Sequence, residues 1–256
     1  MRADEFSKMR ALENANWWFR GRRQLLRGLI RRLGFDDALI LDAGCGTGFA
    51  RRELDKVGTV IGLDTSPEAF ALGQDDEATG CIAVIEQAPF ENDTFDLAVA
   101  LDLLEHLEDD HRALAEIYRV CKPGGYLFAT VPACQWIWSR HDEVLGHRRR
   151  YSAADLGRKV REAGFAISKL SYVVTTVFPL AAAYRLMRRS AAKTNASSDL
   201  FRMPEPANSL LAGLMNLESR LAWHARLPFG LTAFVLASKA KESDNLVSPE
   251  GTRRSE

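Results

Sequence analysis

The chain has 256 residues, 46% of them hydrophobic, which allows one large domain or one domain with a sizeable insertion. Its 34 lysines and arginines balance 34 aspartates and glutamates, so no global positive field favours nucleic acid, and we expect no such partner. The four cysteines form no C-x-x-C pair, which argues against a disulfide framework and fits a reducing cytosol.

Residues 1–37 have a polar, helical pattern, and we predict an N-terminal helical cap. Three aromatic residues are followed there by three arginines: Trp17, Trp18, Phe19, Arg20, Arg22 and Arg23. One interpretation is a helix pair whose aromatic side chains cover a sheet. The other is a lid over a bound cofactor, with an arginine, Arg20 in our prediction, reaching a carboxylate of that cofactor. Both can hold at once.

The stretch LDAGCGTG, residues 41–48, follows an apolar run that begins at Ala38. The run lacks alternation, which indicates a strand buried on both faces in a parallel sheet. Glycine is needed where a backbone turns tightly or must approach a ligand closely. A strand, a glycine turn and a following helix together predict a site for a nucleotide-like cofactor. A plain connecting turn is the alternative.

The loop lacks the dinucleotide fingerprint G-x-G-x-x-G, because Phe49 or Arg51 stands where the third glycine would be. Asp42 instead precedes the first glycine by two residues, where its carboxylate would repel a pyrophosphate but suit an ammonium group. S-adenosylmethionine carries an amino group and a sulfonium, so the loop favours this cofactor over NAD. The predicted contacts in the loop are Asp42, Gly44, Cys45, Gly46 and Gly48.

Beyond the glycines, apolar runs and helical patterns alternate, which predicts an α/β protein with a doubly wound, mostly parallel sheet. The predicted strands are residues 38–41, 59–63, 81–85, 95–101, 126–131, 165–170 and 231–238. Residues 49–56 are the predicted first crossover helix. Asp64 follows the second strand, about 20 residues beyond the glycines, where doubly wound folds hold ribose hydroxyls. We therefore predict that Asp64, with Thr65 beside it, binds the cofactor.

Four segments resemble class I S-adenosylmethionine-dependent methyltransferases of the small-molecule, ubiquinone-biosynthesis-like branch: LDAGCGTG, GLDTS (62–66), APFENDTFDLAVALDLLEHL (88–107) and RVCKPGGYLFATVP (119–132). NWWFRGRR (16–23) and HDEVLGHRRRYS (141–152) further resemble a bacterial subgroup of unsettled substrate. The resemblance implies a seven-stranded Rossmann-like fold, with the glycine loop on the methionine part of the cofactor and Asp64 on its ribose. It also places Ile85 near the adenine and Leu101 beside the cofactor. Val84 stands where many relatives have a polar residue, so the adenine contacts should be backbone and packing contacts.

Methyl transfer to a hydroxyl requires removal of a proton, and histidine is the side chain best matched to that task at neutral pH. Our candidates for the base are His106, His141 and His147. The irregular stretch from Trp136 to Tyr151 follows the fifth strand, at the carboxyl-end side where such folds bind ligands. We predict a substrate loop in which four residues act on the acceptor: Trp136, Arg148 and Arg150 as ligands and Tyr151 as an orienting group. The alternative is a loop with solvated arginines and packed tryptophans.

Asp102, Glu105 and His106 follow the fourth strand within one expected helical turn. The resemblance implies two interpretations of this set. Some relatives use an acid-x-x-Glu-His set to bind a divalent metal. The same Glu-His pair also occurs in metal-free relatives, where it shapes the pocket. We predict no metal, and we keep these three residues as the alternative ligand set.

We divide the chain into a cap (1–37), a cofactor-binding core (38–170), a helical insertion (171–229), the last core strand (230–240) and a disordered tail (241–256). The insertion has an apolar segment with a basic end: Arg185, Arg188 and Arg189. It could cover the pocket, contact an anionic membrane through residues 171–190, or form a homodimer seam. No signal peptide or spanning segment is evident, so we expect a cytoplasmic protein, with the inner face of the membrane as the alternative.

These patterns lead to one main hypothesis and one rival. The main hypothesis is an S-adenosylmethionine-dependent methyltransferase that acts on a small-molecule or lipid-linked acceptor, on oxygen rather than carbon or nitrogen. The rival is a catalytically silent S-adenosylmethionine-binding subunit that acts through a partner protein.

Overall fold

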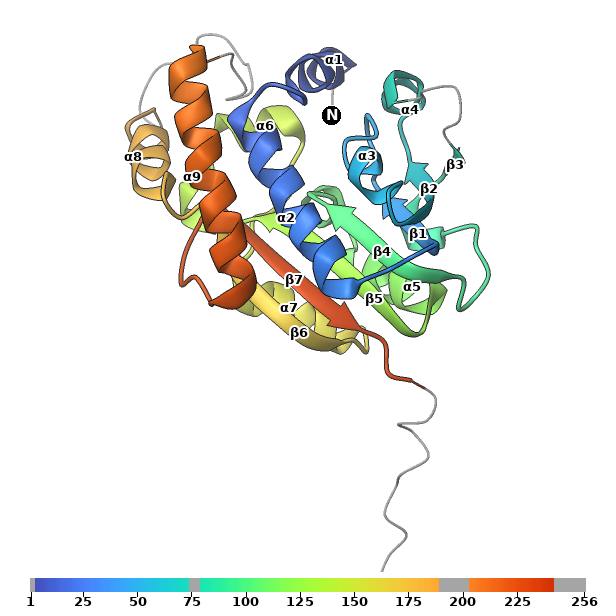
Figure 1. The fold of residues 1–256 in the computed structure, drawn as a ribbon. Coiled ribbons are helices and arrows are strands. Elements are labelled where there is room, and N and C mark those ends of the chain that lie inside the picture. The colour runs from blue at the N-terminus through green and yellow to red at the C-terminus, as the bar shows by residue number, and fades with distance from the viewer. Residues whose placement is uncertain (1–2, 74–78, 189–202, 242–256) are drawn as a thin grey trace, which may run out of the picture.

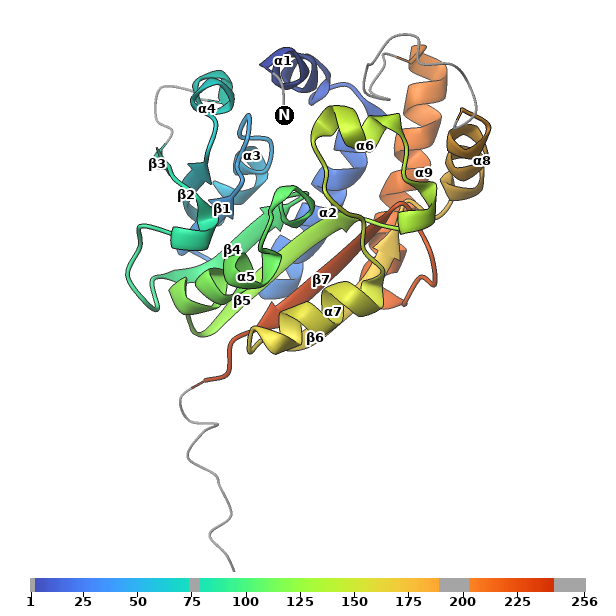
Figure 2. The same cartoon turned by 180° about the vertical axis from the view of Figure 1, so that it is seen from behind.

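The computed structural model describes residues 3–73, 79–188 and 203–241 (Figure 1). The predictions for Arg189 and for the tail from residue 242 onward concern residues outside these ranges. Within the described chain, one sheet with helices on both faces forms the body of the protein (Figures 1 and 2).

The sheet contains seven strands in the order β3-β2-β1-β4-β5-β7-β6. The strands are β1 Ala38–Ala43, β2 Gly58–Asp64, β3 Thr79–Ile82, β4 Phe95–Leu101, β5 Cys121–Pro132, β6 Ala166–Val173 and β7 Thr232–Ser238. All pairs among β1 to β5 are parallel, whereas β7 is antiparallel to β5 and β6. The predicted doubly wound, mostly parallel sheet is confirmed. Its order reverses at β1 and β4, whose carboxyl ends therefore mark the switch point where such sheets bind ligands.

Helices cover both faces of this sheet (Figures 1 and 2). The helices are α1 Ala3–Leu12, α2 Trp17–Leu33, α3 Arg51–Leu54, α4 Pro67–Gly73, α5 Asp110–Val120, α6 Arg140–Leu145, α7 Ala153–Glu162, α8 Phe178–Arg188 and α9 Glu205–His224. Helices α2 and α9 pack on one face and α5 and α7 on the other, each layer with its own buried apolar cluster. Helices α1, α4, α6 and α8 lie beyond the carboxyl ends of the parallel strands and surround the switch point.

Helices α2 and α9 are far apart in the sequence but pack side by side (Figure 1). Gly28 on α2 faces Trp223 on α9, and a Cβ at this glycine would lie 2.1 Å from the indole nitrogen. That nitrogen donates a hydrogen bond to the Leu25 carbonyl at 3.1 Å. The N-terminal segment and the insertion before β7 therefore form one layer.

Helix α9 carries leucines at helical spacing, but three of them lie at the surface. Leu210, Leu217 and Leu221 are 66%, 67% and 50% exposed. The buried face of α9 instead includes Ala212, Met215, Ala222 and Trp223. Met215 and Trp223 face Gly21 and Gly28 of α2, and these glycines allow the close approach of the two helices. In the part of the chain that the structure describes, no helix combines the length and apolar character needed to cross a bilayer.

Several predicted boundaries differ from the structure. The third strand is Thr79–Ile82 rather than residues 81–85, and Ile85 begins a short 3-10 turn. The helix after the glycine loop is reduced to Arg51–Leu54. The turn after β4 is a 3-10 turn over Leu104–His106, preceded by Asp102 at a φ of 51°. The acid-x-x-Glu-His set therefore does not share one regular helix.

Candidate active site

A cavity of about 1100 Å³ opens at the switch point, above the carboxyl ends of β1, β2, β4 and β5. Pockets for one small ligand usually measure about 300–1,000 Å³, so this cavity has room for a cofactor and a second molecule. The predicted site residues that line it are Asp42, Gly44, Cys45, Gly46, Asp64, Thr65, Ile85, Leu101, Asp102, Glu105, His106, His141, His147 and Arg150. The glycine loop, α1, α2, α8 and the segment after α6 complete its walls.

The glycine loop has the conformation that its sequence predicts. Gly44, Gly46 and Gly48 have φ values of 69°, 51° and 74°, in the left-handed region that glycine tolerates. The Gly44 N–H donates to the Leu63 carbonyl at 2.7 Å, which folds the loop onto β2. A Cβ at Gly44 would also lie 2.8 Å from the Leu103 side chain. Glycine at this position therefore keeps the floor of the cavity open.

Asp64 lies at the end of β2 and joins two segments of the floor. Its Oδ2 accepts the Gly46 N–H at 2.8 Å and its Oδ1 accepts the Ser66 N–H at 2.9 Å. A carboxylate offers about four lone-pair positions, so each oxygen can accept one more hydrogen bond from a ligand. Asp64 thus both holds the loop and can bind hydroxyl groups.

Asp42 lies at the end of β1 with 3% of its surface exposed. Its Oδ2 has no hydrogen-bond partner among the described residues. Burial raises the pKa of Asp42 to about 7, and the charge of Asp64 adds to this effect while Arg51 opposes it. A buried, unpartnered carboxylate beside a cavity needs a donor or cationic group to compensate it. The ammonium group of S-adenosylmethionine fits that requirement.

The opposite end of the floor is formed by the segment after β3. Ile85 is 2% exposed and lines the cavity together with Ala83 and Glu86. Val84 is 45% exposed and is not part of the lining, so the adenine contacts predicted for this segment remain apolar or backbone contacts. Glu86 is a polar lining residue that the sequence analysis did not select.

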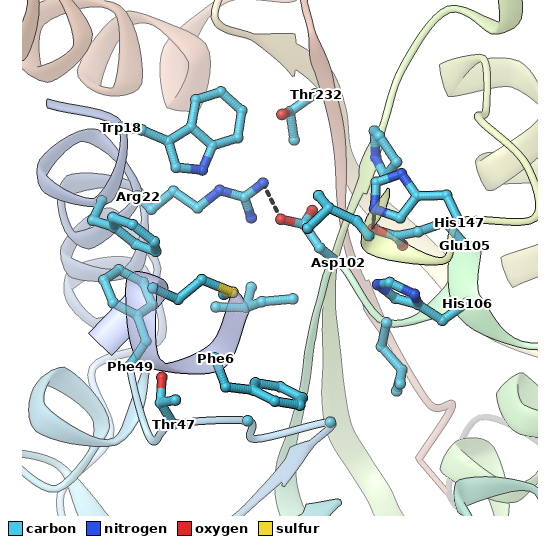
Figure 3. A pocket seen from close by; sticks show the side chains of 18 of the residues that line it. Phe6, Trp18, Arg22, Thr47, Phe49, Asp102, Glu105, His106, His147 and Thr232 are labelled. Carbon is cyan, nitrogen blue, oxygen red and sulfur yellow. Dashed lines mark ion pairs between the residues drawn. The ribbon is translucent and has the colours of Figure 1, made fainter. Parts of the chain in front are cut away.

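Helices α1 and α2 form an aromatic wall, which includes Phe6 and Trp18 (Figure 3). The side chain of Glu13, just after α1, hydrogen-bonds Thr47 of the glycine loop and is 3% exposed. The structure therefore combines both interpretations of the N-terminal segment, because its aromatic residues pack against the core and also close over the cavity.

The arginine that enters the cavity is Arg22 rather than the predicted Arg20. Arg20 lies outside the lining, 4.0 Å from Glu205 on α9. Arg22 donates to the Thr130 hydroxyl at 2.7 Å and forms an ion pair with Asp102 (Figure 3). Its guanidinium carbon lies 4.9 Å from the centre of the Trp18 ring. Successive helical residues point about 100° apart, so Arg20 and Arg22 face nearly opposite directions.

Three histidines form the wall opposite the aromatic residues. Burial lowers the pKa of His106 to about 4, with a further contribution from His147, and lowers the pKa of His141 to about 3, with Arg185 contributing. Both imidazoles are therefore neutral at pH 7. The Nδ1 of His147 lies 2.8 Å from Oδ1 of Asp142, a buried residue on α6. Asp142 was not selected from the sequence, although it stands five residues before His147.

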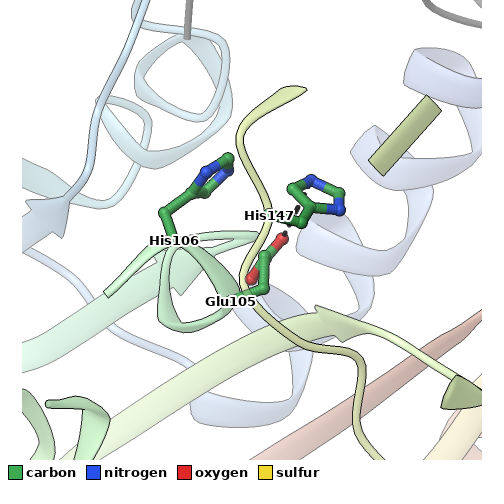
Figure 4. Close-up of side chains that lie close together, drawn as sticks. All are labelled: Glu105, His106 and His147. Atoms are coloured by element: carbon green, nitrogen blue, oxygen red, sulfur yellow. Dashed lines mark ion pairs between the residues drawn. The ribbon is translucent and has the colours of Figure 1, made fainter. Parts of the chain in front are cut away.

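Glu105 lies beside two of these histidines, His106 and His147 (Figure 4). Its side chain is fully buried, and neither carboxylate oxygen has a hydrogen-bond partner among the described residues. Burial, with the charge of Asp102 adding to it, holds the pKa of Glu105 well above its usual range. Ligand atoms of Glu105, His106 and His147 lie within 4.8 Å of one another. Asp102 instead accepts a hydrogen bond from the Thr130 hydroxyl at 3.1 Å and pairs with Arg22, so the predicted ligand set is not the one assembled here.

The predicted substrate loop is only partly in contact with the cavity. Arg150 lines it, but its Nε donates to Asp142 at 2.8 Å and its Nη1 to the Ala133 carbonyl at 2.9 Å, so it mainly holds the loop. Arg148 points outward with 53% of its side chain exposed. Trp136 is 51% exposed, with its ring 5.8 Å from that of Phe178. Neither Arg148 nor Trp136 is part of the cavity lining.

Tyr151 is a structural residue rather than a lining one. It is 2% exposed, and its hydroxyl donates to Asp110 at 2.5 Å while lying 3.1 Å from the Leu104 carbonyl. We expect Tyr151→Phe to lower the free energy of unfolding by about 1–2 kcal/mol, because it removes a buried hydrogen bond to the Asp110 carboxylate, which keeps its contacts with Arg149 and Lys159. Binding of S-adenosylmethionine should not change. Urea unfolding measures the stability and calorimetric titration measures the binding. Weakened binding at unchanged stability would show that Tyr151 acts in the binding site after all.

Residues 41–129 match the family model of a methyltransferase domain. The chain is 29% identical over 164 residues to a Mycolicibacterium smegmatis protein named "Probable S-adenosylmethionine-dependent methyltransferase", which covers 61% of this chain and 62% of that relative. It is 28% identical over 185 residues to the ubiquinone biosynthesis O-methyltransferase of Thiobacillus denitrificans, which covers 63% of this chain and 78% of that relative. The chain thus spans less than two thirds of the first relative's length.

A solved chain from the complex between the Haloferax volcanii Trm112 methyltransferase activator and a methyltransferase has the same fold, with a TM-score of 0.61 at 18% identity. The likeness covers 93% of this chain and 96% of that one. The segment matched by the family model contains the end of β1, the glycine loop and β4, and so carries the floor of the cavity. The fold is therefore the Rossmann-like methyltransferase fold. Residues 41–129 match a methyltransferase domain, and the relatives support an enzyme domain whose cofactor is S-adenosylmethionine.

Proposed function

We propose that this protein transfers the methyl group of S-adenosylmethionine to a hydroxyl of a small-molecule or lipid-linked acceptor. The observation that carries the proposal is a cavity that extends from the glycine loop into a chamber between the aromatic residues of α1 and α2 and the histidines. One wall of that chamber is apolar, and another carries neutral imidazoles (Figure 3).

In this proposal the floor of the cavity binds the cofactor. Asp42 faces the ammonium group, Asp64 accepts the ribose hydroxyls, and Ile85 packs against the adenine. The carboxylate contact that we expected of Arg20 passes to Arg22, the arginine that lines the cavity. The methyl group then points toward the chamber between the aromatic wall and the histidines.

The apolar wall supports an acceptor with an apolar part. Leu180 and Met187 on α8 line the cavity, yet they are 77% and 71% exposed, so the rim of the cavity is itself apolar. An exposed apolar rim continuous with a binding cavity suits an amphiphilic ligand or a lipid surface. We extend the proposal to peripheral contact between residues 171–190 and an anionic membrane. The structure describes residues 171–188 of this segment.

The chemistry is an in-line displacement at carbon. The acceptor oxygen forms a bond to the methyl carbon while the carbon–sulfur bond breaks, and the sulfonium leaves as a neutral thioether. Positioning of well-oriented reactants can supply about 7–11 kcal/mol of such a barrier. The hydroxyl proton passes to an imidazole of the histidine wall, where neutral His106 and His141 can accept it at pH 7.

Radiolabelled methyl transfer tests the proposal directly. The protein is incubated with S-adenosylmethionine labelled in its methyl group and with a whole-cell extract, and the label is then partitioned between organic and aqueous phases. We expect labelled product in the organic phase, with the new methyl carbon bonded to oxygen by NMR. Label confined to the aqueous phase would contradict an apolar acceptor. No transfer by protein that binds the cofactor would favour the silent subunit, whose partner remains to be found.

Alanine substitution of His106, His141 and His147, one at a time, tests whether a histidine of this wall is the general base. Loss of a general base typically lowers turnover by about 10²–10⁴-fold, and we expect a loss of that size from at least one of His106, His141 and His147. His111→Ala is the matched control, because His111 lies on the surface 3.6 Å from Glu162 and outside the cavity. Unchanged turnover in all three variants would refute the assignment of the base.

A further inference from the structure

The carboxylate of Glu105 is buried without a hydrogen-bond partner among the described residues, at either of its oxygens. The residue also borders the cavity. A buried carboxylate without a donor or cation is strongly unfavourable, and almost all buried polar side chains in folded proteins have a partner. The side chain therefore points to a ligand that binds at this wall.

Two neighbouring histidines, His106 and His147, each place a ring nitrogen close to the Glu105 carboxylate. The Nδ1 of His106 lies 3.3 Å from the Gly146 carbonyl, which can only accept, so this nitrogen carries the proton. The Nδ1 of His147 is engaged in the same way by the Asp142 carboxylate at 2.8 Å. In both rings the Nε2 lone pair is then left for a ligand. The Nε2 of His147 lies 4.0 Å from Oε1 of Glu105 (Figure 4).

The cluster is held from outside by further hydrogen bonds. The Arg148 N–H donates to the Glu105 carbonyl at 2.8 Å, which ties the 3-10 turn to the segment after α6. Asp142 accepts from the Ser139 N–H at 2.9 Å and from Arg150 Nε at 2.8 Å, so it is fixed while it orients His147. A carboxylate or carbonyl on the far nitrogen of a histidine is typical of metal-ligating histidines.

We propose that Glu105, His106 and His147 bind one divalent transition-metal cation, with Asp142 as the positioning residue of His147. Two imidazoles and one carboxylate suit zinc, manganese, iron, cobalt or nickel, whereas calcium and magnesium prefer oxygen ligands. Asp102 is outside the set, because Arg22 and Thr130 already engage its carboxylate. This assignment replaces both our prediction of no metal and the alternative set that contained Asp102.

The cation would lie on the wall that faces the acceptor, where a Lewis acid lowers the pKa of a bound hydroxyl. With the cation bound, His106 and His147 are ligands rather than bases, and His141 is the imidazole of this wall that can accept the hydroxyl proton. Only this role rests on the proposed function. The binding of the cation does not, so the two can fail separately.

Cobalt(II) titration of chelator-treated, dialysed protein tests the site without reference to turnover. We expect one Co²⁺ per chain by calorimetry, with visible absorption bands that appear on binding. Glu105→Gln and His147→Ala should each weaken binding by at least about 100-fold. Asp142→Asn should weaken it by about 10–100-fold and change the absorption spectrum, as expected for a group that orients a ligand.

Two controls make the result specific. Asp102→Asn should retain the affinity for Co²⁺ within about threefold, and so should His111→Ala at the surface. Circular dichroism and S-adenosylmethionine titration show whether each variant is folded. A folded wild type that binds no Co²⁺ would overturn the proposal, as would Co²⁺ binding that survives both Glu105→Gln and His147→Ala. Loss of Co²⁺ binding in Asp102→Asn would overturn the ligand set. Co²⁺ binding by protein that binds no S-adenosylmethionine would refute the proposed function alone.

Discussion

Asp64→Ala should weaken the binding of S-adenosylmethionine by at least about 100-fold, as measured by calorimetric titration. In our proposal the variant loses two hydrogen bonds to ribose hydroxyls, and bonds to a charged group are worth about 1.5–3 kcal/mol each. It also releases the Gly46 N–H, which Asp64 holds at 2.8 Å, so the glycine loop loses one of its hydrogen bonds to β2. A 100-fold loss corresponds to about 2.7 kcal/mol, within the range that these contacts can supply.

Ser66→Ala is the matched control for this experiment. The Ser66 hydroxyl caps the following turn by accepting the Ala69 N–H at 3.1 Å, whereas its backbone N–H is what Asp64 binds. The control should therefore disturb α4 but leave cofactor binding within a few fold. Equal binding by wild type and Asp64→Ala would show that the ribose lies elsewhere. No binding by the folded wild type would contradict S-adenosylmethionine as the cofactor.

The residues at the floor of the cavity could be predicted from the sequence because they occupy local, repeated positions. Asp42 and Asp64 each stand at the end of a strand, and the parallel sheet brings all such ends to one edge. Leu101 follows the same rule at the end of β4. The strand order then needs only right-handed connections to place these residues around one cavity.

The histidine wall and the loop after β5 depend on contacts that no local pattern encodes. Tyr151 was selected as an orienting group, but its hydroxyl is taken by Asp110, which lies on another helix. The pairing of Arg22 with Asp102 likewise joins residues 80 positions apart, and it removes Asp102 from the metal set. The direction of a side chain in an irregular segment is decided by such distant partners, so the residue types there could be predicted but not their roles.

Asp42→Asn should raise the free energy of unfolding of the cofactor-free protein at neutral pH. It should also reduce the change of this free energy between pH 4 and pH 7. Burial raises the pKa of Asp42 from 3.8 to about 7 in the folded chain. Between these values the folded chain keeps a proton that the unfolded chain has lost, so this group lowers stability as pH rises. Each pKa unit corresponds to about 1.4 kcal/mol, so the loss reaches about 4 kcal/mol above pH 7.

Urea unfolding of wild type and variant at four pH values between 4.5 and 7.5 measures this effect, and the difference between the two curves isolates Asp42 from other carboxylates. Asp55→Asn is the control, because Asp55 is a neighbouring acid whose side chain is 45% exposed. In our proposal the cofactor reverses the penalty, since its ammonium group compensates the ionised carboxylate. Saturating S-adenosylmethionine should therefore raise the melting temperature of the wild type more at pH 7.5 than at pH 5.5, and that of Asp42→Asn equally at both. Parallel pH profiles for wild type and variant would show that Asp42 ionises normally, and the cation-binding role assigned to it would then lose its physical basis.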